Sequence, residues 1–503
     1  MTDEREYINI GKMTHVPKES KYRGHGWFYE RCGIGRIMED AAPFDTYESS
    51  IPEYHAYHLF DLSHVIMTTE EGIIPKEIGA KLLTALKEME KEGIDEARKK
   101  AGGVAHSGEA YLIQKLGWDV GGYIHAGRSS NDLRPCYHRI QQRHLLLDVA
   151  DEVNKIRESL LNLAPEHVET ILPEYTAIQH ARPMTLGFYF ESFVTMLERK
   201  FEMFELAYKH TNISPLGTAD GAGSDFPINL QRTAELAGFD GVFDNALDVY
   251  HNYDYRLEAF ALLAAITDVT ARLGDDIQLW CSYEFRMADV ADRYAGTSSI
   301  MSQKKNPSPR LLVSVNEDIR RSMLYRGHDF KHMMNAIRLT VNSLRFARGL
   351  VETTTWKTER MRELCEYGFM GNAALCRILV QENELPWRTA HQITAIMMRQ
   401  AHEEGMEMAD VTPELLNKSA LEYVGYGKPL KISEEKLKEA FSVENSVMTL
   451  LSHGGTAPVR VKEQIAASRE KLKRDKTLVA EKRNRLKSAA NLREKAIVAL
   501  TSK

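Results

Sequence analysis

Apolar residues recur at helical spacing through the middle of the chain. From Leu133 onward they follow one another at alternating steps of three and four, which predicts a long helix with a single apolar seam. A second long helix is predicted after the turn at Pro183, a third across residues 262–280, and a fourth from Pro309. The seams consist of Leu146, Val149, Val153, Ile156, Leu160 and Leu163 in the first helix, and Leu262, Ile266, Val269, Leu273, Ile277 and Trp280 in the third. Several long helices with apolar seams are typical of a bundle.

The elements on either side of this region are shorter and are punctuated by Gly and Pro. We therefore expect an all-α fold of three helical domains: an N-terminal domain over 1–127, a central long-helix bundle over 128–370, and a small C-terminal domain with a charged tail over 371–503. Lysines and arginines of the tail alternate with Glu and Asp at i,i+4 spacing. This pattern favours a solvated helix face over a binding site for an acidic partner.

Composition excludes several classes of protein. The chain has 503 residues, 27% of them charged and 43% hydrophobic, with a net charge of −6, so nothing indicates a nucleic-acid partner. The N-terminus lacks the apolar run of a signal peptide, and no segment approaches the ~20 apolar residues of a membrane span. We expect a cytoplasmic protein with no membrane partner, and no metal or organic cofactor. The five dispersed cysteines have no metal-ligand spacing and are predicted to be buried thiols: Cys32, Cys136, Cys281, Cys365 and Cys376.

The segment GTSSIMSQKKNPSPR, residues 296–310, carries the clearest chemistry. Small hydroxylated residues lead into two lysines and an Asn-Pro pair, just before the helix predicted from Pro309. Hydroxyls, backbone amides and ammonium groups near a helix N-terminus favour a bound carboxylate. The alternative is a Ser-rich linker before a helix, and composition alone does not separate the two.

The same segment resembles the G-S-S-x-M-P-x-K-x-N-P signature of the fumarase/aspartase superfamily. Lys304-Lys305-Asn306-Pro307 resembles the form found in the argininosuccinate lyase family. HAGRSSND, residues 125–132, is similar to that family's H-T-G-R-S-R-N-D, and the stretches 215–248 and 452–465 are similar to two further family segments. The four segments occur in the family's order and span most of the chain.

The resemblance implies a homotetramer with a shared multi-helix core, in which each active site draws on three subunits. It also implies a carbon–nitrogen lyase that acts on a small dicarboxylate and releases fumarate from an N-substituted aspartate by anti elimination. Ser298 matches the family's catalytic base. A serine is a weak base, and Lys304 with nearby amides would lower its pKa. Lys304 and Asn306 would hold the carboxylate whose charge rises in the carbanion.

Further positions match residues that hold the substrate in the family. Ser129, Asn131 and Thr176 match residues that bind its carboxylates, and Gln179 and Ser299 are assigned to substrate binding beside them. By residue type alone, Ser129, Asn131 and Thr176 would be cap or turn residues.

One departure from the family concerns a charged pair. A family histidine is Ala177 here, and the glutamate with which it pairs is Leu311. Both members are apolar, as is required if neither is to be left buried without its partner. On the assumption that residues 176–183 are helical, His180 lies on nearly the same face as Ala177 and is predicted to replace the lost histidine as proton donor. The alternative is a structural histidine.

A second departure concerns the amine. Ser130 and Leu230 stand where the family has arginines, and the run that recognises the arginine moiety is replaced by residues 335–354. A site without those polar partners would bind a guanidinium poorly. We therefore predict an amine product other than arginine. Two alternatives stay open at this point, an authentic argininosuccinate lyase and a catalytically silent scaffold or binding protein; adenylosuccinate lyase fits the Lys-Lys pair less well.

Overall fold

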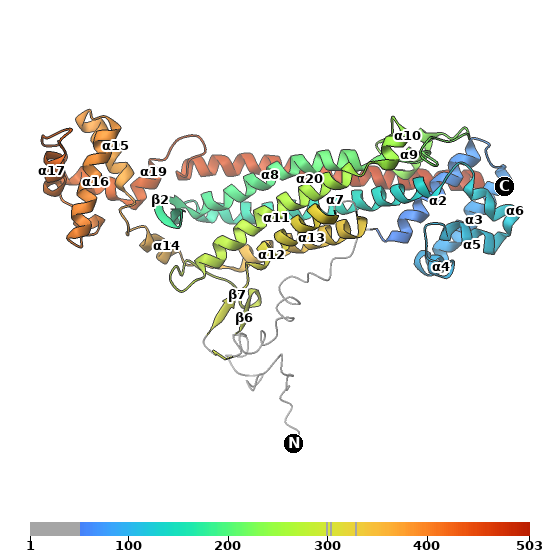
Figure 1. Cartoon of the computed structure of the whole chain (residues 1–503), viewed down its shortest axis with the longest axis horizontal. Helices are drawn as coiled ribbons and strands as arrows, with labels where there is room; N and C mark the ends of the chain where they lie inside the picture. Colours follow the sequence, from blue (N-terminus) through green and yellow to red (C-terminus); the bar gives the residue numbers. More distant parts are fainter. Residues whose placement is uncertain (1–50, 298–299, 302–303, 327–328, 503) are drawn as a thin grey trace, which may run out of the picture.

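The computed structural model describes residues 51–502 apart from 298–299, 302–303 and 327–328. Its long helices lie side by side in an elongated bundle (Figure 1). They are α7 (Ser130–Leu163), α8 (Leu186–Thr211), α11 (Asp254–Trp280), α12 (Leu311–Arg326), α13 (Phe330–Thr353) and α20 (Pro458–Thr501). The expected helical fold class is confirmed as a mainly helical fold, and the homotetramer stays a prediction.

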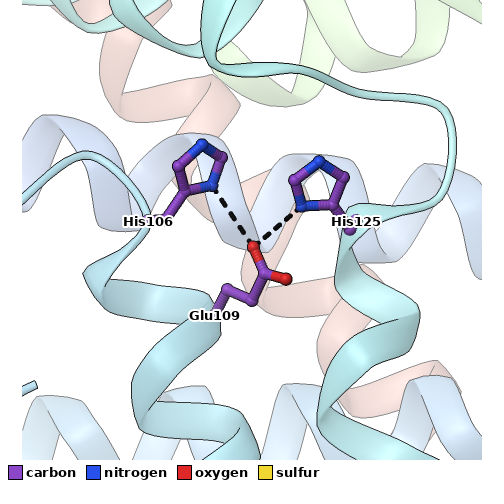
Figure 2. Close-up of side chains that lie close together, drawn as sticks. All are labelled: His106, Glu109 and His125. Atoms are coloured by element: carbon purple, nitrogen blue, oxygen red, sulfur yellow. Dashed lines mark hydrogen bonds and ion pairs between the residues drawn. The ribbon is translucent and has the colours of Figure 1, made fainter.

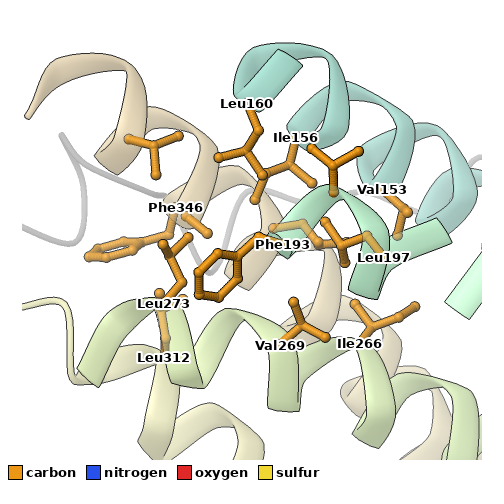
Figure 3. Packing of buried hydrophobic residues seen from close by; sticks show 14 of the residues in the cluster. Val153, Ile156, Leu160, Phe193, Leu197, Ile266, Val269, Leu273, Leu312 and Phe346 are labelled. Atoms are coloured by element: carbon orange, nitrogen blue, oxygen red, sulfur yellow. The ribbon is translucent and has the colours of Figure 1, made fainter. Parts of the chain in front are cut away.

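The predicted seams form the core of this bundle. Ile156 and Leu160 of α7 meet Phe193 of α8 and Leu273 of α11, and all four side chains are almost completely buried (Figure 3). Burial of each such side chain contributes roughly 1.5–3 kcal/mol. The three-and-four spacing visible in the sequence thus sets which face of each helix points inward.

The charged tail is the helix α20, which runs back along the bundle instead of staying with the preceding small unit (Figure 1). It contacts α7 and α8 and then reaches the N-terminal helices. Its buried residues Val461, Ile465, Leu472 and Val479 follow helical spacing, and most residues between them are exposed. The tail therefore has the solvated face expected from its charges and, opposite it, an apolar face that the charges conceal.

Smaller helical units lie at the two ends of the bundle (Figure 1). The N-terminal unit consists of α2 (Glu53–Glu70), α3 (Lys76–Glu92), α4 (Ile94–Lys100), α5 (Ser107–Leu116), α6 (Trp118–Gly121) and η2 (Gly122–His125). At the other end lie α14 (Thr358–Leu364), α15 (Asn372–Asn383), α16 (Trp387–Glu403), η5 (Met408–Asp410), α17 (Pro413–Glu422), α18 (Glu434–Phe441) and α19 (Val443–Met448). Each unit has an apolar cluster of its own, and Ile497 of α20 joins the N-terminal one.

Strands in the described residues form two-stranded sheets in the connections between helices. The antiparallel pairs are β1 (Ile171–Thr176) with β2 (Gln179–Thr185), β5 (Ala288–Asp289) with β8 (Thr355–Trp356), and β6 (Ala295–Thr297) with β7 (Lys305–Pro307). The parallel pair is β3 (Ile213–Ser214) with β4 (Gly241–Val242). Short helices complete the connections: η3 (Ala164–His167), α9 (Leu230–Ala237), α10 (Ala246–His251) and η4 (Asp292–Tyr294).

Two features bear on the expectations from composition. Among the described helices, none combines the length and the apolar character that a membrane crossing requires. The described cysteines are free thiols, three of them buried, and Cys32 lies outside the described residues.

Candidate active site

The segment HAGRSSND forms the entrance to α7. Ser129 is the N-cap of that helix, and its hydroxyl accepts a hydrogen bond from the backbone N–H of Asn131 at 3.3 Å. The carboxylate of Asp132 accepts one from the backbone N–H of Ser129 at 3.0 Å, which completes a capping box. Ser129 thus makes the cap contact expected from residue type alone. It is half-buried, as are Ser130 and Asn131.

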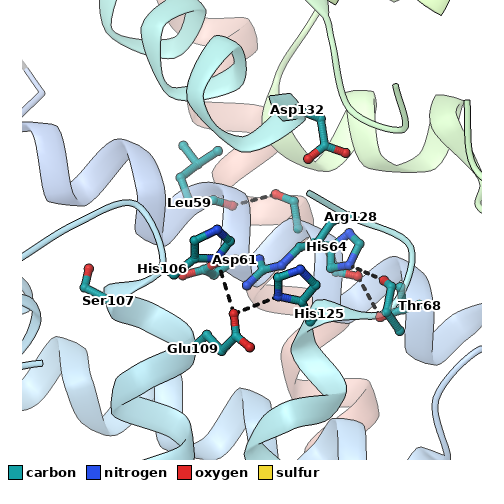
Figure 4. Close-up of polar contacts among 12 residues, drawn as sticks. Leu59, Asp61, His64, Thr68, His106, Ser107, Glu109, His125, Arg128 and Asp132 are labelled. Atoms are coloured by element: carbon teal, nitrogen blue, oxygen red, sulfur yellow. Dashed lines mark hydrogen bonds and ion pairs between the residues drawn. The ribbon is translucent and has the colours of Figure 1, made fainter. Parts of the chain in front are cut away.

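Buried ion pairs attach the HAGRSSND segment to α2, where Asp61 lies close to Arg128 (Figure 4). Asp61 of α2 accepts hydrogen bonds from Arg128 at 2.6 Å and from Arg98 at 2.5 Å, and all three side chains are almost completely buried. Burial opposes ionisation of Asp61, but the two guanidinium groups hold its pKa below the usual value. His64 lies 2.9 Å from the backbone oxygen of Ala126, and burial together with the charge of Arg128 lowers the pKa of His64 to about 3.

These supporting residues were not singled out from the sequence. Arg128 stands inside the HAGRSSND motif, and its place there is the signal that was available. Asp61 and Arg98 lie in helices far away along the chain, and no local pattern connects them to the motif. A buried carboxylate with two arginine partners fixes the backbone of the segment and therefore the position of Ser129.

The glycine-rich stretch packs over the same segment. Gly127 has a φ of 70°, and Cγ2 of Ile228 lies 3.0 Å from the position of an added Cβ. Gly217 has a φ of 93°, and a Cβ there would lie 2.2 Å from Cδ2 of Leu230. The half-buried side chain of Leu230 therefore lies over the backbone of Gly217, where it contributes apolar surface and no charge.

The segment from Thr176 to Pro183 is a hairpin and not a helix, so the assumed helical step from Ala177 to His180 is wrong. Thr176 pairs with Gln179 across a turn formed by Ala177 and Ile178, whose φ angles are 51° and 59°. Left-handed backbone at a β-branched residue is strained. Thr176 and Gln179 are both exposed at this tip, at the end of the bundle away from α2 and α3 (Figure 1).

His180 has partners within its own chain. Its Nδ1 lies 3.2 Å from the backbone oxygen of Tyr367, and its Nε2 lies 3.2 Å from the hydroxyl of Tyr175. Because a carbonyl only accepts, the Nδ1–H donates to Tyr367 and the Tyr175 hydroxyl donates to Nε2. Burial raises the pKa of Tyr175 to about 12, which keeps that hydroxyl protonated. The role of His180 as proton donor stays a prediction, and it requires release of the Tyr175 hydrogen bond.

Within and next to the GTSSIMSQKKNPSPR segment, the strands β6 and β7 pair with each other. Gly296 pairs with Asn306 and Thr297 with Lys305. Nζ of Lys305 donates to the carboxylate of Asp289 at 2.7 Å and to the backbone oxygen of Val290. Successive side chains of a strand leave on opposite sides, so the side chain of Asn306 leaves β7 on the side opposite to that of Lys305. Lys304 is exposed and Asn306 half-buried, whereas Ser298 and Ser299 lie outside the described residues.

One chain does not bring the three segments together. Ser129 stands before the first residue of α7, and the hairpin with Thr176 follows its last turn, so the helix separates them by about 50 Å. The rings of Tyr175 and Phe285 lie 5.3 Å apart, which places β1 near the residues that lead to the β6–β7 hairpin. Two of the predicted segments thus lie toward one end of the bundle and the third at the other.

A cluster of possible metal ligands includes His125, the first residue of the HAGRSSND segment. His106, Glu109 and His125 place their ligand atoms within 4.8 Å of one another. The sequence alone does not show this cluster, because His106 and Glu109 are three residues apart whereas His125 joins them only through the fold. The available signal was the H-x-x-E step at the start of α5.

Known families match the chain over most of its length. Residues 67–313 match a family model described as Lyase, and residues 369–448 match one described as Argininosuccinate lyase C-terminal. The argininosuccinate lyase of Methanocaldococcus jannaschii is 34% identical over 465 residues, which cover 89% of this chain and 94% of that protein. The chain belongs to the argininosuccinate lyase family. The resemblance found in the sequence is thereby confirmed, and the protein is a lyase of the fumarase/aspartase superfamily.

Further relatives place it within that family. The argininosuccinate lyase of Methanosphaera stadtmanae is 31% identical over 453 residues, covering 86% of this chain and 96% of that protein. EDDS lyase in complex with formate has a TM-score of 0.82 at 25% identity and covers 90% of this chain and 97% of that one. An EDDS lyase variant with bound fumarate also has a TM-score of 0.82, at 25% identity, with 92% and 97% covered. The chain is a fumarate-releasing lyase of the argininosuccinate lyase and EDDS lyase group.

Proposed function

We propose that the protein releases fumarate from an N-substituted aspartate whose amine is not arginine. The observation that carries the proposal is the position of Leu230 on Gly217, at a place where argininosuccinate lyases have an arginine. Its aliphatic side chain covers backbone beside the HAGRSSND segment and offers no hydrogen bond to a polar amine. Ser130, the first residue of α7, replaces a second arginine with a short hydroxyl.

The likeness to EDDS lyase supports the same choice. Both EDDS lyase structures match this chain with TM-scores of 0.82. The fold of this chain is therefore shared with a lyase that is not named argininosuccinate lyase. The succinyl part of the substrate is common to N-substituted aspartates. Differences among such enzymes therefore belong to the residues around the amine, where this chain departs from its family.

The chemistry is assigned to the β6–β7 hairpin and its neighbours. Ser298 removes the proton beside one carboxylate, and Lys304 and Asn306 stabilise the carbanion that forms. The electrons of the C–N bond leave with the nitrogen, which takes up a proton, and fumarate remains. Because Lys305 is held by Asp289, the proposal gives the two lysines different tasks: Lys305 fixes the hairpin and Lys304 binds substrate.

The substrate assignment is tested by comparing kcat/KM for argininosuccinate with kcat/KM for aspartates that carry smaller or differently charged N-substituents. We expect argininosuccinate to be disfavoured by on the order of a few kcal/mol, because its guanidinium lacks polar partners. Purified protein incubated with fumarate and a panel of amines, followed by mass spectrometry of the adducts, identifies the preferred amine. A clear preference for argininosuccinate would overturn the assignment, and no reaction with any substrate would favour the silent scaffold.

The base is tested by Ser298→Ala. Loss of a base that acts in the transition state should lower kcat by about 10²–10⁴-fold and change substrate affinity far less. Ser314→Ala, an exposed serine on α12, is the matched control and should keep wild-type turnover. Near-native turnover in Ser298→Ala would remove Ser298 from the mechanism.

A further inference from the structure

His106, Glu109 and His125 converge from two segments of the N-terminal unit (Figure 2). His106 precedes α5, Glu109 stands in the first turn of α5, and His125 ends η2. Nδ1 of His106 lies 3.2 Å from Oε2 of Glu109, and Nδ1 of His125 lies 2.8 Å from the same oxygen. The two imidazole rings stack with their centroids 5.2 Å apart. Each ring thus turns its own Nδ1 toward Oε2 of Glu109.

The bonding of His106 is incomplete in this arrangement. Its Nδ1 is shielded from solvent and makes no well-directed hydrogen bond to a described residue, although the carboxylate oxygen is near. An occluded ring nitrogen without a directed partner is uncommon in a folded protein. A cation between the ring and the carboxylate would supply the missing interaction through the nitrogen lone pair.

The geometry points to a binding site for a divalent d-block cation of the Zn²⁺ type, formed by His106, Glu109 and His125. Zn²⁺ binds histidine nitrogen and carboxylate oxygen at about 2.0–2.2 Å, which places tetrahedral ligand atoms about 3.3 Å apart. The 3.2 Å distance from His106 Nδ1 to Oε2 is close to that value, whereas the 2.8 Å hydrogen-bond distance from His125 Nδ1 must lengthen when a cation replaces the shared proton. Two imidazoles with one carboxylate suit Zn²⁺, Co²⁺ or Ni²⁺, whereas Mg²⁺ and Ca²⁺ prefer oxygen alone.

The position of the cluster lets a cation enter from solvent and lets it link two segments of the fold. The side chains of His106, Glu109 and His125 are 34%, 19% and 47% exposed, so an ion can enter and a water molecule can take the fourth position. His125 stands four residues before Ser129. A bound cation would join α5 to the segment that leads into α7, in addition to the Asp61 ion pairs. Cation binding should therefore stabilise the folded protein and raise its Tm.

The test uses the full-length protein, freed of metal by a chelator and titrated with Zn²⁺ against a chromophoric competitor. We expect one tight site per chain, and an absorption spectrum with Co²⁺ that reports nitrogen ligands in a tetrahedral site. Glu109→Gln and His125→Ala should each weaken Zn²⁺ binding by at least about 100-fold, since even loss of an outer-shell partner costs 10–100-fold. His391→Ala, an exposed histidine on α16, is the control and should leave binding unchanged.

Folding of each variant is checked by its circular dichroism and by its Tm without metal, so a loss of binding is not mistaken for unfolding. The Tm increase caused by Zn²⁺ should disappear in both ligand variants and persist in the control. Equal Zn²⁺ affinity in wild type and in both ligand variants would overturn the site, as would wild-type protein that binds no Zn²⁺. Neither result depends on the substrate, because no measurement uses catalytic activity.

Discussion

At the scale of single residues, Asp132 carries an electrostatic conflict next to the predicted substrate-binding segment. Its carboxylate is 1% exposed and caps α7 through Ser129, and burial raises its pKa to about 6. Hydrogen bonds from backbone N–H groups and the charge of Arg128 offset only part of that effect. The folded state therefore holds a proton on Asp132 over a pH range in which the unfolded chain has released it.

This conflict predicts a pH-dependent loss of stability. Between about pH 4 and pH 6 the folded state binds more protons than the unfolded state, so the contribution of Asp132 to stability falls as pH rises. A shift of about two pKa units corresponds to roughly 3 kcal/mol. Asp132→Asn keeps the acceptor for the Ser129 N–H but does not ionise, so its Tm should rise relative to wild type from pH 4.5 to 7. A Tm difference that stays constant over this range would contradict the shifted pKa.

At the scale of elements, α20 is attached to the bundle by buried charges as well as by its apolar face. Asp475 of α20 and Arg157 of α7 form an ion pair at 2.7 Å, with exposed fractions of 1% and 0%. Asp475→Ala leaves the buried guanidinium of Arg157 with only its longer ion pair to Glu198, at 3.6 Å, and should lower the free energy of unfolding by up to about 3–5 kcal/mol. Chemical denaturation measures this loss. Glu481→Ala, on the exposed side of α20, should change stability by less than about 0.5 kcal/mol; equal effects would show that the ion pair is unimportant.

At the scale of the whole molecule, the candidate segments lie too far apart to form one site within a single chain, so the predicted active site that combines them needs more than one chain. The β6–β7 hairpin lies toward one end of the bundle, and Ser129 and Asn131 lie about 50 Å along α7 at the other. Copies arranged antiparallel would bring the hairpin of one chain to the start of α7 in another. The predicted homotetramer with shared sites supplies such an arrangement.

Mixing inactive variants tests this arrangement. Ser298→Ala removes the predicted base from the 296–310 segment and Asn131→Ala removes a predicted substrate-binding residue at the start of α7, so each variant alone should be inactive. Mixed and reassembled, they should recover activity, because some sites then combine an intact hairpin with an intact α7 from another chain. A mixture of Ser298→Ala with Lys304→Ala should stay inactive, since both changes lie in the 296–310 segment and no chain then supplies that segment intact. Failure of the first mixture to recover, or a stable monomer in sedimentation, would contradict shared sites.

The sequence by itself determined the long helices and the family. Leu146 to Leu160 and Leu262 to Trp280 keep helical spacing over several turns, and a helix is formed by contacts between residues close together in the chain. The motifs around Ser129 and Asn306 are also local, so their resemblance to the argininosuccinate lyase family was visible without a structure. Their roles in catalysis stay predictions that the proposed variants test.

Only the tertiary structure decided the remaining features, because each depends on residues far apart in the chain. The hairpin at Thr176 is formed by the pairing of β1 with β2 and by packing on α14 and α19. No alternation of polar and apolar residues in this stretch predicts the two strands. The apolar positions of α20 are widely spaced among charged residues, and only its contacts with α7 and α8 show that they form a buried face. Asp61 meets Arg128, and His125 meets Glu109, only where the helices of the N-terminal unit pack together. Spacing along the chain specifies a helix face, whereas packing determines what that face meets.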